Sequence, residues 1–135
     1  MKPKNQLFKL VVSAVIILLL SAGMASAQTE ITIDVAPNVL NIASEGTVVT
    51  VHTDIAYSAV EGASVQLNGI DIAWWKSDSR GQFVAKFNME EVTELVTHDI
   101  LELGDITLTL TGESTLGAFS GSQVISVIDV ESKGK

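Results

Sequence analysis

Apolar and polar residues alternate one by one along most of this chain, and this period of two constrains the fold more than any other feature. Apolar side chains recur at every second position in residues 31–35 and 106–110, and at almost every second position in 49–55. Successive side chains of a β-strand point to opposite faces, so such segments predict strands that bury one face. Shorter stretches of the same kind predict further strands at 40–42, 65–67, 70–74, 83–87 and 124–130.

Turn-forming residues separate these segments at intervals of about a dozen residues, the spacing typical of all-β domains. Asn68 and Gly69 predict a tight hairpin turn, because both residue types tolerate positive φ angles. The polar run at 76–81 predicts a loop. Together these features predict an all-β fold, an immunoglobulin-like antiparallel β-sandwich of about seven or eight strands.

One segment follows a helical period instead. Four apolar residues between positions 89 and 97 recur at spacings of three and four, and three glutamates occupy the other face. Asn88 precedes them as an N-cap, and Glu91 stands at the third helical position of a variant capping box. The sequence therefore predicts one short helix near 89–97, crossing one end of the sandwich.

The N-terminal segment has the three parts of a secretory signal peptide. Three lysines precede an apolar run at 10–20, and small residues at 25–27 end the segment. We expect cleavage between Ala27 and Gln28, with an uncleaved N-terminal anchor as the alternative. The expected domains are a signal peptide at 1–27, a β-sandwich at 28–130 and a flexible tail at 131–135. Either outcome predicts a secreted or extracytoplasmic location, at the cell surface or in a periplasm, and cleavage leaves no membrane span in the mature form.

Composition excludes several classes of function. The chain has no cysteine, which excludes a disulfide scaffold, a cysteine-ligated metal site and a thiol nucleophile. Residues 28–135 hold five Lys and Arg against sixteen Asp and Glu, a net charge of −11, which argues against nucleic acid as a partner. No G-x-S-x-G motif is present, and with only two histidines we expect no enzyme and no cofactor.

Several motifs together resemble a family of β-sandwich modules. They include the segments around Asp34-Val35-Ala36-Pro37, Val65-Gln66-Leu67-Asn68-Gly69 and Thr107-Leu108-Thr109-Leu110-Thr111-Gly112, and the match spans most of residues 31–128. The family is known from secreted and cell-surface proteins of archaea, especially methanogens, and of some bacteria. The resemblance implies a sandwich fold and an accessory, non-catalytic role. The family often has Asp where this chain has Gln123, which weakens any ion site at that turn.

The two adjacent tryptophans provide the first candidate site. Continuing the alternation of Ile70 and Ile72 places Trp74 in the core and Trp75 outside, on the same face as Asp71. An exposed indole beside polar groups is suited to stacking on a sugar ring or anchoring a partner. The alternative is that Trp75 packs against the helix or a loop edge.

A second candidate lies along the predicted helix. Glu91, Glu94 and His98 stand at offsets of three and four, so their side chains share one face and offer oxygen and imidazole ligands for a divalent metal. A solvated acidic helix face explains the same residues without a metal. Calcium is a separate candidate ligand, for the aspartates Asp54, Asp71, Asp78 and Asp105 at the ends of the sandwich. The calcium-loop motif D-x-[DN]-x-[DN]-G is absent from the sequence.

These observations favour a secreted, non-catalytic β-sandwich that serves cell-surface or extracellular structure, or protein interaction, with a protein or glycan of the cell envelope as its partner. One alternative is a glycan- or calcium-binding module. Another is an envelope subunit that polymerises by pairing edge strands, with residues 124–130 as the contact.

Overall fold

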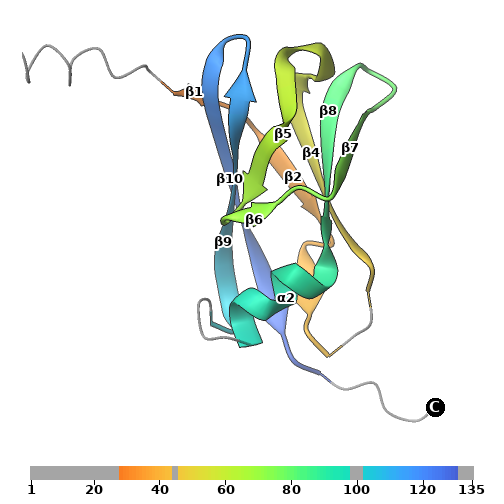
Figure 1. The fold of residues 1–135 in the computed structure, drawn as a ribbon. Coiled ribbons are helices and arrows are strands. Elements are labelled where there is room, and N and C mark those ends of the chain that lie inside the picture. The colour runs from red at the N-terminus through yellow and green to blue at the C-terminus, as the bar shows by residue number, and fades with distance from the viewer. Residues whose placement is uncertain (1–27, 44–45, 98–101, 131–135) are drawn as a thin grey trace, which may run out of the picture.

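Two β-sheets pack face to face in the computed structural model, which describes residues 28–43, 46–97 and 102–130 (Figure 1). The six-stranded sheet contains β1 (Thr29–Glu30), β3 (Val39–Asn41), β5 (Val60–Leu67), β6 (Ile70–Asp71), β9 (Gly104–Ser114) and β10 (Gly117–Ile128). The four-stranded sheet contains β2 (Ile33–Ala36), β4 (Val48–Ala56), β7 (Trp74–Ser77) and β8 (Gln82–Asn88). The predicted all-β sandwich is confirmed.

The strand order shows how the chain passes between the layers. The six-stranded sheet runs β1-β10-β9-β5-β6, with β3 also pairing with β10, and the four-stranded sheet runs β2-β4-β8-β7. Neighbouring strands are antiparallel except for β1 and β3, which run parallel to β10. The chain crosses from one sheet to the other repeatedly; these crossings include the one between β2 and β3, where the Ala36–Pro37 peptide is cis, and the one between β6 and β7.

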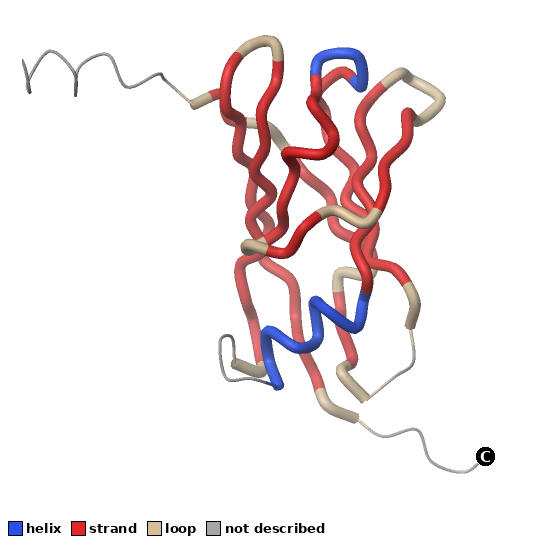
Figure 2. Tube along the Cα trace, in the orientation of Figure 1, coloured by secondary structure: helices blue, strands red, loops and turns tan. Residues whose placement is uncertain are grey.

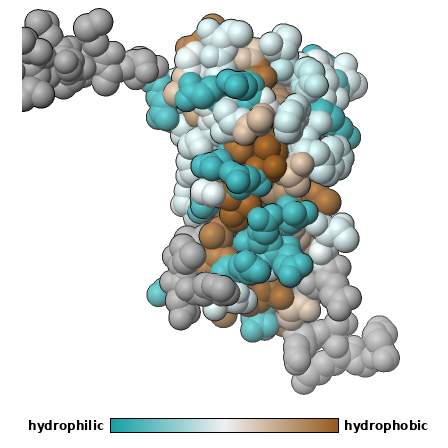
Figure 3. Space-filling model, viewed as in Figure 1, coloured by the Kyte–Doolittle hydropathy of each residue, from teal (hydrophilic) through white to brown (hydrophobic). Residues whose placement is uncertain are grey.

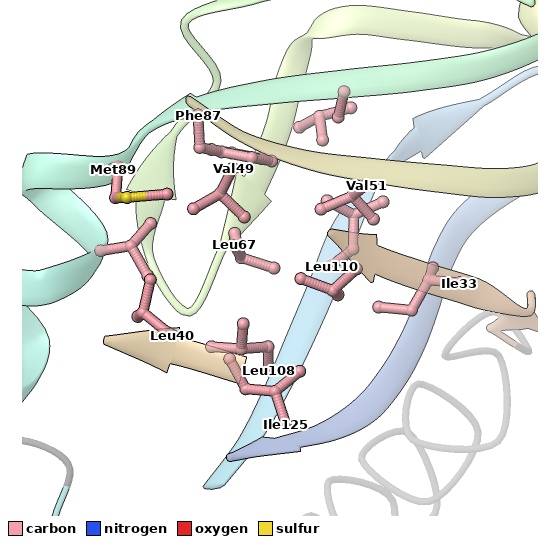
Figure 4. Packing of buried hydrophobic residues seen from close by; sticks show 14 of the residues in the cluster. Ile33, Leu40, Val49, Val51, Leu67, Phe87, Met89, Leu108, Leu110 and Ile125 are labelled. Carbon is pink, nitrogen blue, oxygen red and sulfur yellow. The ribbon is translucent and has the colours of Figure 1, made fainter. Parts of the chain in front are cut away.

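The inward faces of both sheets form one apolar core. Phe83, Phe87 and Phe119 are its largest fully buried side chains, and Leu40, Leu67, Leu108 and Leu110 fill the space between them. Figure 4 shows side chains from both sheets meeting there. Each such side chain contributes about 1.5–3 kcal/mol when it leaves water, so this core accounts for a stable domain without disulfides.

The predicted helix is confirmed as α2 (Met89–Thr97), which crosses the lower end of the sandwich directly after β8 (Figure 2). Its four apolar residues are buried, and the Asn88 amide donates to the Glu91 carboxylate at 3.0 Å. A single 3₁₀ turn, η1 (Tyr57–Ala59), joins β4 to β5. Within the described residues, no helix has the length and apolar character that crossing a bilayer requires.

The hairpin turn between β5 and β6 is confirmed too. Asn68 and Gly69 adopt φ angles of 47° and 83°, the left-handed conformations that the sequence predicts there. The Asn68 side chain also accepts a hydrogen bond from the Thr109 amide at 2.7 Å, which ties the turn to β9.

The prediction that Trp74 lies in the core is wrong. Residues 70–74 do not form one strand: β6 pairs with β5 in the six-stranded sheet, whereas β7 pairs with β8 in the other sheet. The crossing at Ile72 and Ala73 breaks the alternation that the sequence suggests, and Trp74 is 48% exposed. Seen in the orientation of Figure 1, the surface shows hydrophobic side chains between hydrophilic ones along the middle of the molecule (Figure 3).

The alternative of a polymerising subunit used residues 124–130 as its contact. Within that segment, residues 126–128 of β10 pair with β3, and residues 124–127 pair with β9 on the other side, so this part of β10 is not a free strand edge. The expectations for the signal peptide at 1–27 and the tail at 131–135 concern residues outside those described.

Candidate functional site

The outer face of the four-stranded sheet follows from the register of its strands. Val35, Val51, Ala85 and Trp75 oppose one another across β2, β4, β8 and β7, and the first three are core residues. Directly opposed residues point to the same side, so the alternate rows face outward. Those outward rows are Ala36–Thr50–Lys86–Trp74 and Asp34–His52–Val84–Lys76.

The first outward row brings an indole and an ammonium together. The Lys86 ammonium lies 5.3 Å from the centroid of the Trp74 ring, and it donates a hydrogen bond to the Thr50 hydroxyl at 2.9 Å. A cation over an exposed aromatic ring contributes about 0.5–1 kcal/mol. The contact therefore orients both side chains while leaving nearly half of the Trp74 surface in water.

The second row continues this surface. Val84 has no exposed surface although it points outward, so neighbouring side chains on this face cover it. Its register neighbours are His52 on β4 and Lys76 on β7, both exposed. We call the surface formed by Thr50, His52, Trp74, Lys76, Arg80 and Lys86 the β7–β8 face.

All basic residues of the described part of the chain belong to the β7–β8 face. Lys76, Arg80 and Lys86 are the three Lys and Arg residues in the described ranges, in a chain with sixteen Asp and Glu. None of the three forms an ion pair within 4.0 Å with a described carboxylate. The structure thus gathers its cations on one side and leaves their charges uncompensated by direct contact.

Arg80 is held at the rim of the β7–β8 face by a turn built on Asp78. The Asp78 carboxylate accepts hydrogen bonds from the backbone amides of Arg80 at 2.8 Å and Gln82 at 2.9 Å. The Gln82 amide bond holds the pKa of Asp78 below its ordinary value, opposed by desolvation and assisted by the Arg80 amide and the charges of Arg80 and His52. The ionised carboxylate therefore keeps this turn closed at neutral pH.

A hollow of about 440 Å³ lies beside the β7–β8 face. Its polar lining includes Asp34, His52, Asp54 and Arg80. The register of β4 against β8 shifts between His52 and Ala56, and the buried Thr53 hydroxyl crosses this irregularity to donate to the Phe83 carbonyl at 2.6 Å. The Asp54 carboxylate accepts from the Thr32 amide at 2.9 Å, and the side chains of His52 and Arg80 in the same lining are able to donate hydrogen bonds.

The predicted pair Trp75 and Asp71 is separated by the structure. The register places Trp75 on the inward side of the edge strand β7, where it is 38% exposed and its indole packs on Gly62 of β5, so that it bridges the two sheets. Asp71 lies on β6 and accepts a hydrogen bond from the Gln66 side chain at 2.8 Å. Trp74, which the sequence placed in the core, is the more exposed indole and has the polar neighbours.

The predicted metal ligands on the helix are described only in part. Glu91 and Glu94 are exposed and line a hollow of about 350 Å³ with Gly46, Thr47, Asn88 and Glu90, whereas His98 lies outside the described residues. Among the residues that are described, no group of three or more His, Asp or Glu side chains is arranged to hold a metal ion.

The outer face of the six-stranded sheet has a different chemistry. Thr107, Thr109 and Thr111 on β9 face outward beside Ser120 and Ser122 on β10. The hydroxyls of Thr109 and Ser122 are hydrogen-bonded at 2.9 Å. This face offers hydroxyl groups, and no described Lys or Arg lies on it.

Neither a known family model nor a curated protein sequence matches this chain.

Proposed function

We propose that this chain is an exported, non-catalytic β-sandwich of the immunoglobulin-like type, which binds a partner of the cell envelope through the β7–β8 face. The observation that carries the proposal is the segregation of charge. An exposed indole and the three described Lys and Arg residues, none of them within ion-pair distance of a described carboxylate, stand together on one side of an acidic protein.

The strand order supports the immunoglobulin-like type. In that fold, strands A, B, E and D form one sheet and strands C, F and G form the other. Here the four-stranded sheet runs β2-β4-β8-β7 and the facing sheet contains β10-β9-β5, which is the same order when the strands are lettered along the chain. The passage of the chain from β2 to β3 puts the first strand partly in each sheet.

Export is supported by the sequence of the N-terminal segment. The lysines, the apolar run and the small residues before Gln28 have the order that signal peptidases recognise. The absence of cysteine fits an exported domain whose core is held by packing alone. The resemblance to modules of archaeal and bacterial surface proteins agrees with this location.

A non-catalytic role is supported by the composition of the β7–β8 face. It combines one imidazole, three cations and an indole, and two of its three Asp neighbours, Asp54 and Asp78, are engaged by backbone amides, while Asp34 lies opposite His52 in the register. General acid–base catalysis needs a pair of titratable groups directed at one reacting centre. The arrangement found here instead suits the binding of an anionic or aromatic-stacking partner.

Export is tested by producing the full chain with a C-terminal tag in a bacterial host and measuring the intact mass of the protein in each cell fraction. We expect the protein outside the cytoplasm with its N-terminus at Gln28. The matched variant Ala27→Arg should keep its leader, because a large charged side chain at this position blocks cleavage. Unprocessed wild-type protein in the membrane would support the anchor instead, and unprocessed protein in the cytoplasm would contradict export.

A further inference from the structure

The β7–β8 face presents its groups in a row that crosses the strands. Trp74, Lys86 and Thr50 lie side by side on β7, β8 and β4. Strands in a sheet are about 4.8 Å apart, so these three groups span about 10 Å perpendicular to the strand direction. Lys76 and His52 belong to a second row, which is parallel to the first and lies two residues further along each strand.

This direction discriminates between two kinds of polymeric ligand. A peptide that joins the sheet by strand addition runs parallel to the edge strand, here β7. Such a peptide would contact β7 and would leave Lys86 and Thr50, one and two strands further in, outside its hydrogen-bonding path. A chain that lies across the strands contacts all three groups, and it needs no free backbone edge.

The chemistry of the row fits a sugar polymer with acidic groups. An indole offers a flat, electron-rich surface against which the C–H groups of a pyranose ring pack. The Thr50 hydroxyl and the His52 imidazole can exchange hydrogen bonds with sugar hydroxyls. The ammonium groups of Lys76 and Lys86 and the guanidinium of Arg80 have no described ion-pair partner, so carboxylates on the sugar would find them available.

Charge complementarity sets the class of ligand. The chain as a whole is acidic, with a formal net charge of −8, so its overall charge repels a polyanion at long range. The β7–β8 face holds all the described Lys and Arg residues, beside Asp34, Asp54 and Asp78, and it is therefore the described surface that offers a polyanion cationic contacts. Over distances beyond about 8–10 Å the remaining acidic charges are largely screened at physiological salt.

From these observations we infer that the β7–β8 face binds a polysaccharide of uronic acids, with Trp74 stacked on one sugar ring and Lys86, Lys76 and Arg80 contacting carboxylates. This inference rests on the proposed function, since it names the partner of the same face. It replaces Trp75 with Trp74 as the aromatic platform, because the Trp75 indole packs on Gly62.

The test uses the full chain and three soluble polymers, with retardation in affinity electrophoresis as the readout. Sodium polygalacturonate carries both sugar rings and carboxylates. Fully methyl-esterified polygalacturonate keeps the rings without the charge, and polyglutamate keeps the carboxylates without the rings. We expect binding to polygalacturonate that is at least about tenfold tighter than binding to either control polymer, and that weakens as salt is raised.

Variants assign this binding to the β7–β8 face. Trp74→Ala and Lys76→Met should each weaken binding to polygalacturonate by about fivefold or more, and Thr109→Ala on the opposite face should leave it unchanged. Lys76 has no described hydrogen bond, ion pair or ring contact to lose, and methionine keeps much of the aliphatic side chain beside Val84, so Lys76→Met separates charge from folding. The melting temperature of each variant, measured by circular dichroism, confirms that it is folded.

Three results would overturn the inference. They are no retardation by polygalacturonate, equal binding to polyglutamate, and full binding by folded Trp74→Ala. Equal binding to polyglutamate would point to an acidic protein as the partner. These outcomes are independent of export, because a chain found in the cytoplasm would contradict the proposed location while its binding to each polymer could still be measured.

Discussion

On the outer face of the six-stranded sheet, one pair of hydroxyl side chains bonds across neighbouring strands, whereas on and beside the outer face of the four-stranded sheet an indole and three cations have no described carboxylate within ion-pair distance. Thr109 and Ser122 are hydrogen-bonded at 2.9 Å on the first face. On the second, Lys86 contacts only the Trp74 ring and the Thr50 hydroxyl. Cross-strand pairs stabilise a sheet by about 0.2–1 kcal/mol each, so both faces support their strands.

The two faces differ in how many hydrogen-bonding groups and charges remain available to a ligand. A hydroxyl bonded to its neighbour has much of its hydrogen-bonding capacity satisfied, and it carries no charge. A cation over an indole keeps its charge and most of its donors, and the indole keeps an open surface. The same alternating strands thus build one face whose polar groups satisfy each other and one face whose groups remain available.

The neighbouring tryptophans sharpen this comparison, and they give the largest expected effect. Trp75 bridges the sheets through Gly62, whereas Trp74 lies outside on Lys86. We expect Trp75→Ala to lower the free energy of unfolding by about 2–3 kcal/mol, less than for a fully buried tryptophan. Trp74→Ala should lower it by about 1 kcal/mol or less. Urea denaturation of the two variants measures both values.

Gly62 supplies the control for this first prediction. A Cβ atom at position 62 would lie 2.1 Å from Cε2 of Trp75, so the indole has to move. Gly62→Ala should therefore destabilise the wild-type chain by about 1–2 kcal/mol, and should cost much less in the Trp75→Ala background, where the obstacle is gone. A larger loss for Trp74→Ala than for Trp75→Ala would contradict the assignment of the two indoles to different faces.

A double-mutant cycle on the β7–β8 face gives the next effect in size. Lys86→Met and Trp74→Ala should be coupled by about 0.5–1 kcal/mol in unfolding free energy, because each removes one partner of the same cation–π contact. The matched cycle of Lys76→Met with Trp74→Ala should show coupling near zero. Equal coupling in both cycles would mean that the general positive charge near Trp74, rather than the specific contact, is what stabilises this face.

Most of the architecture is predictable from the sequence because local patterns determine it. The period of two identifies the long strands, the helical spacing identifies α2, and Asn68-Gly69 identifies the β5–β6 turn. Each of these signals depends on residues close in sequence. The crossing of the chain from one sheet to the other between β6 and β7 depends instead on which strands are neighbours in space. The sequence of residues 70–74 keeps its alternating pattern across this crossing and so gives no sign of it.

The candidate site is less predictable for the same reason. The contact of Trp74 with Lys86 depends on the register of β7 against β8. A usable signal was present, because a hairpin centred on Arg80 pairs residues equidistant from it, and positions 74 and 86 are such a pair. The separation of Asp71 from Trp75 had no local signal, since Ile72 and Ala73 look like any other part of a strand.

The smallest expected effect concerns the turn that holds Arg80 at the rim of the β7–β8 face, and it depends on pH. Bonds from the Gln82 and Arg80 amides lower the pKa of Asp78 below its ordinary value of 3.8, so folding favours the ionised carboxylate. Its contribution to stability is therefore present above about pH 3.8 and is lost as the pH falls through the lowered pKa.

We accordingly expect Asp78→Ala to lower the melting temperature at pH 7 and to approach the wild-type value at an acidic pH below the lowered pKa of Asp78, where the wild-type carboxyl is protonated as well. Ser79→Ala, in the same turn but without a described side-chain hydrogen bond, is the matched control and should leave the melting temperature unchanged at either pH. Thermal unfolding followed by circular dichroism measures these differences. A deficit for Asp78→Ala that is equal at both pH values would show that the turn is stabilised by the size of the side chain and not by its charge. The rim of the β7–β8 face would then be insensitive to pH, like the hydroxyl pair of Thr109 and Ser122 on the opposite sheet.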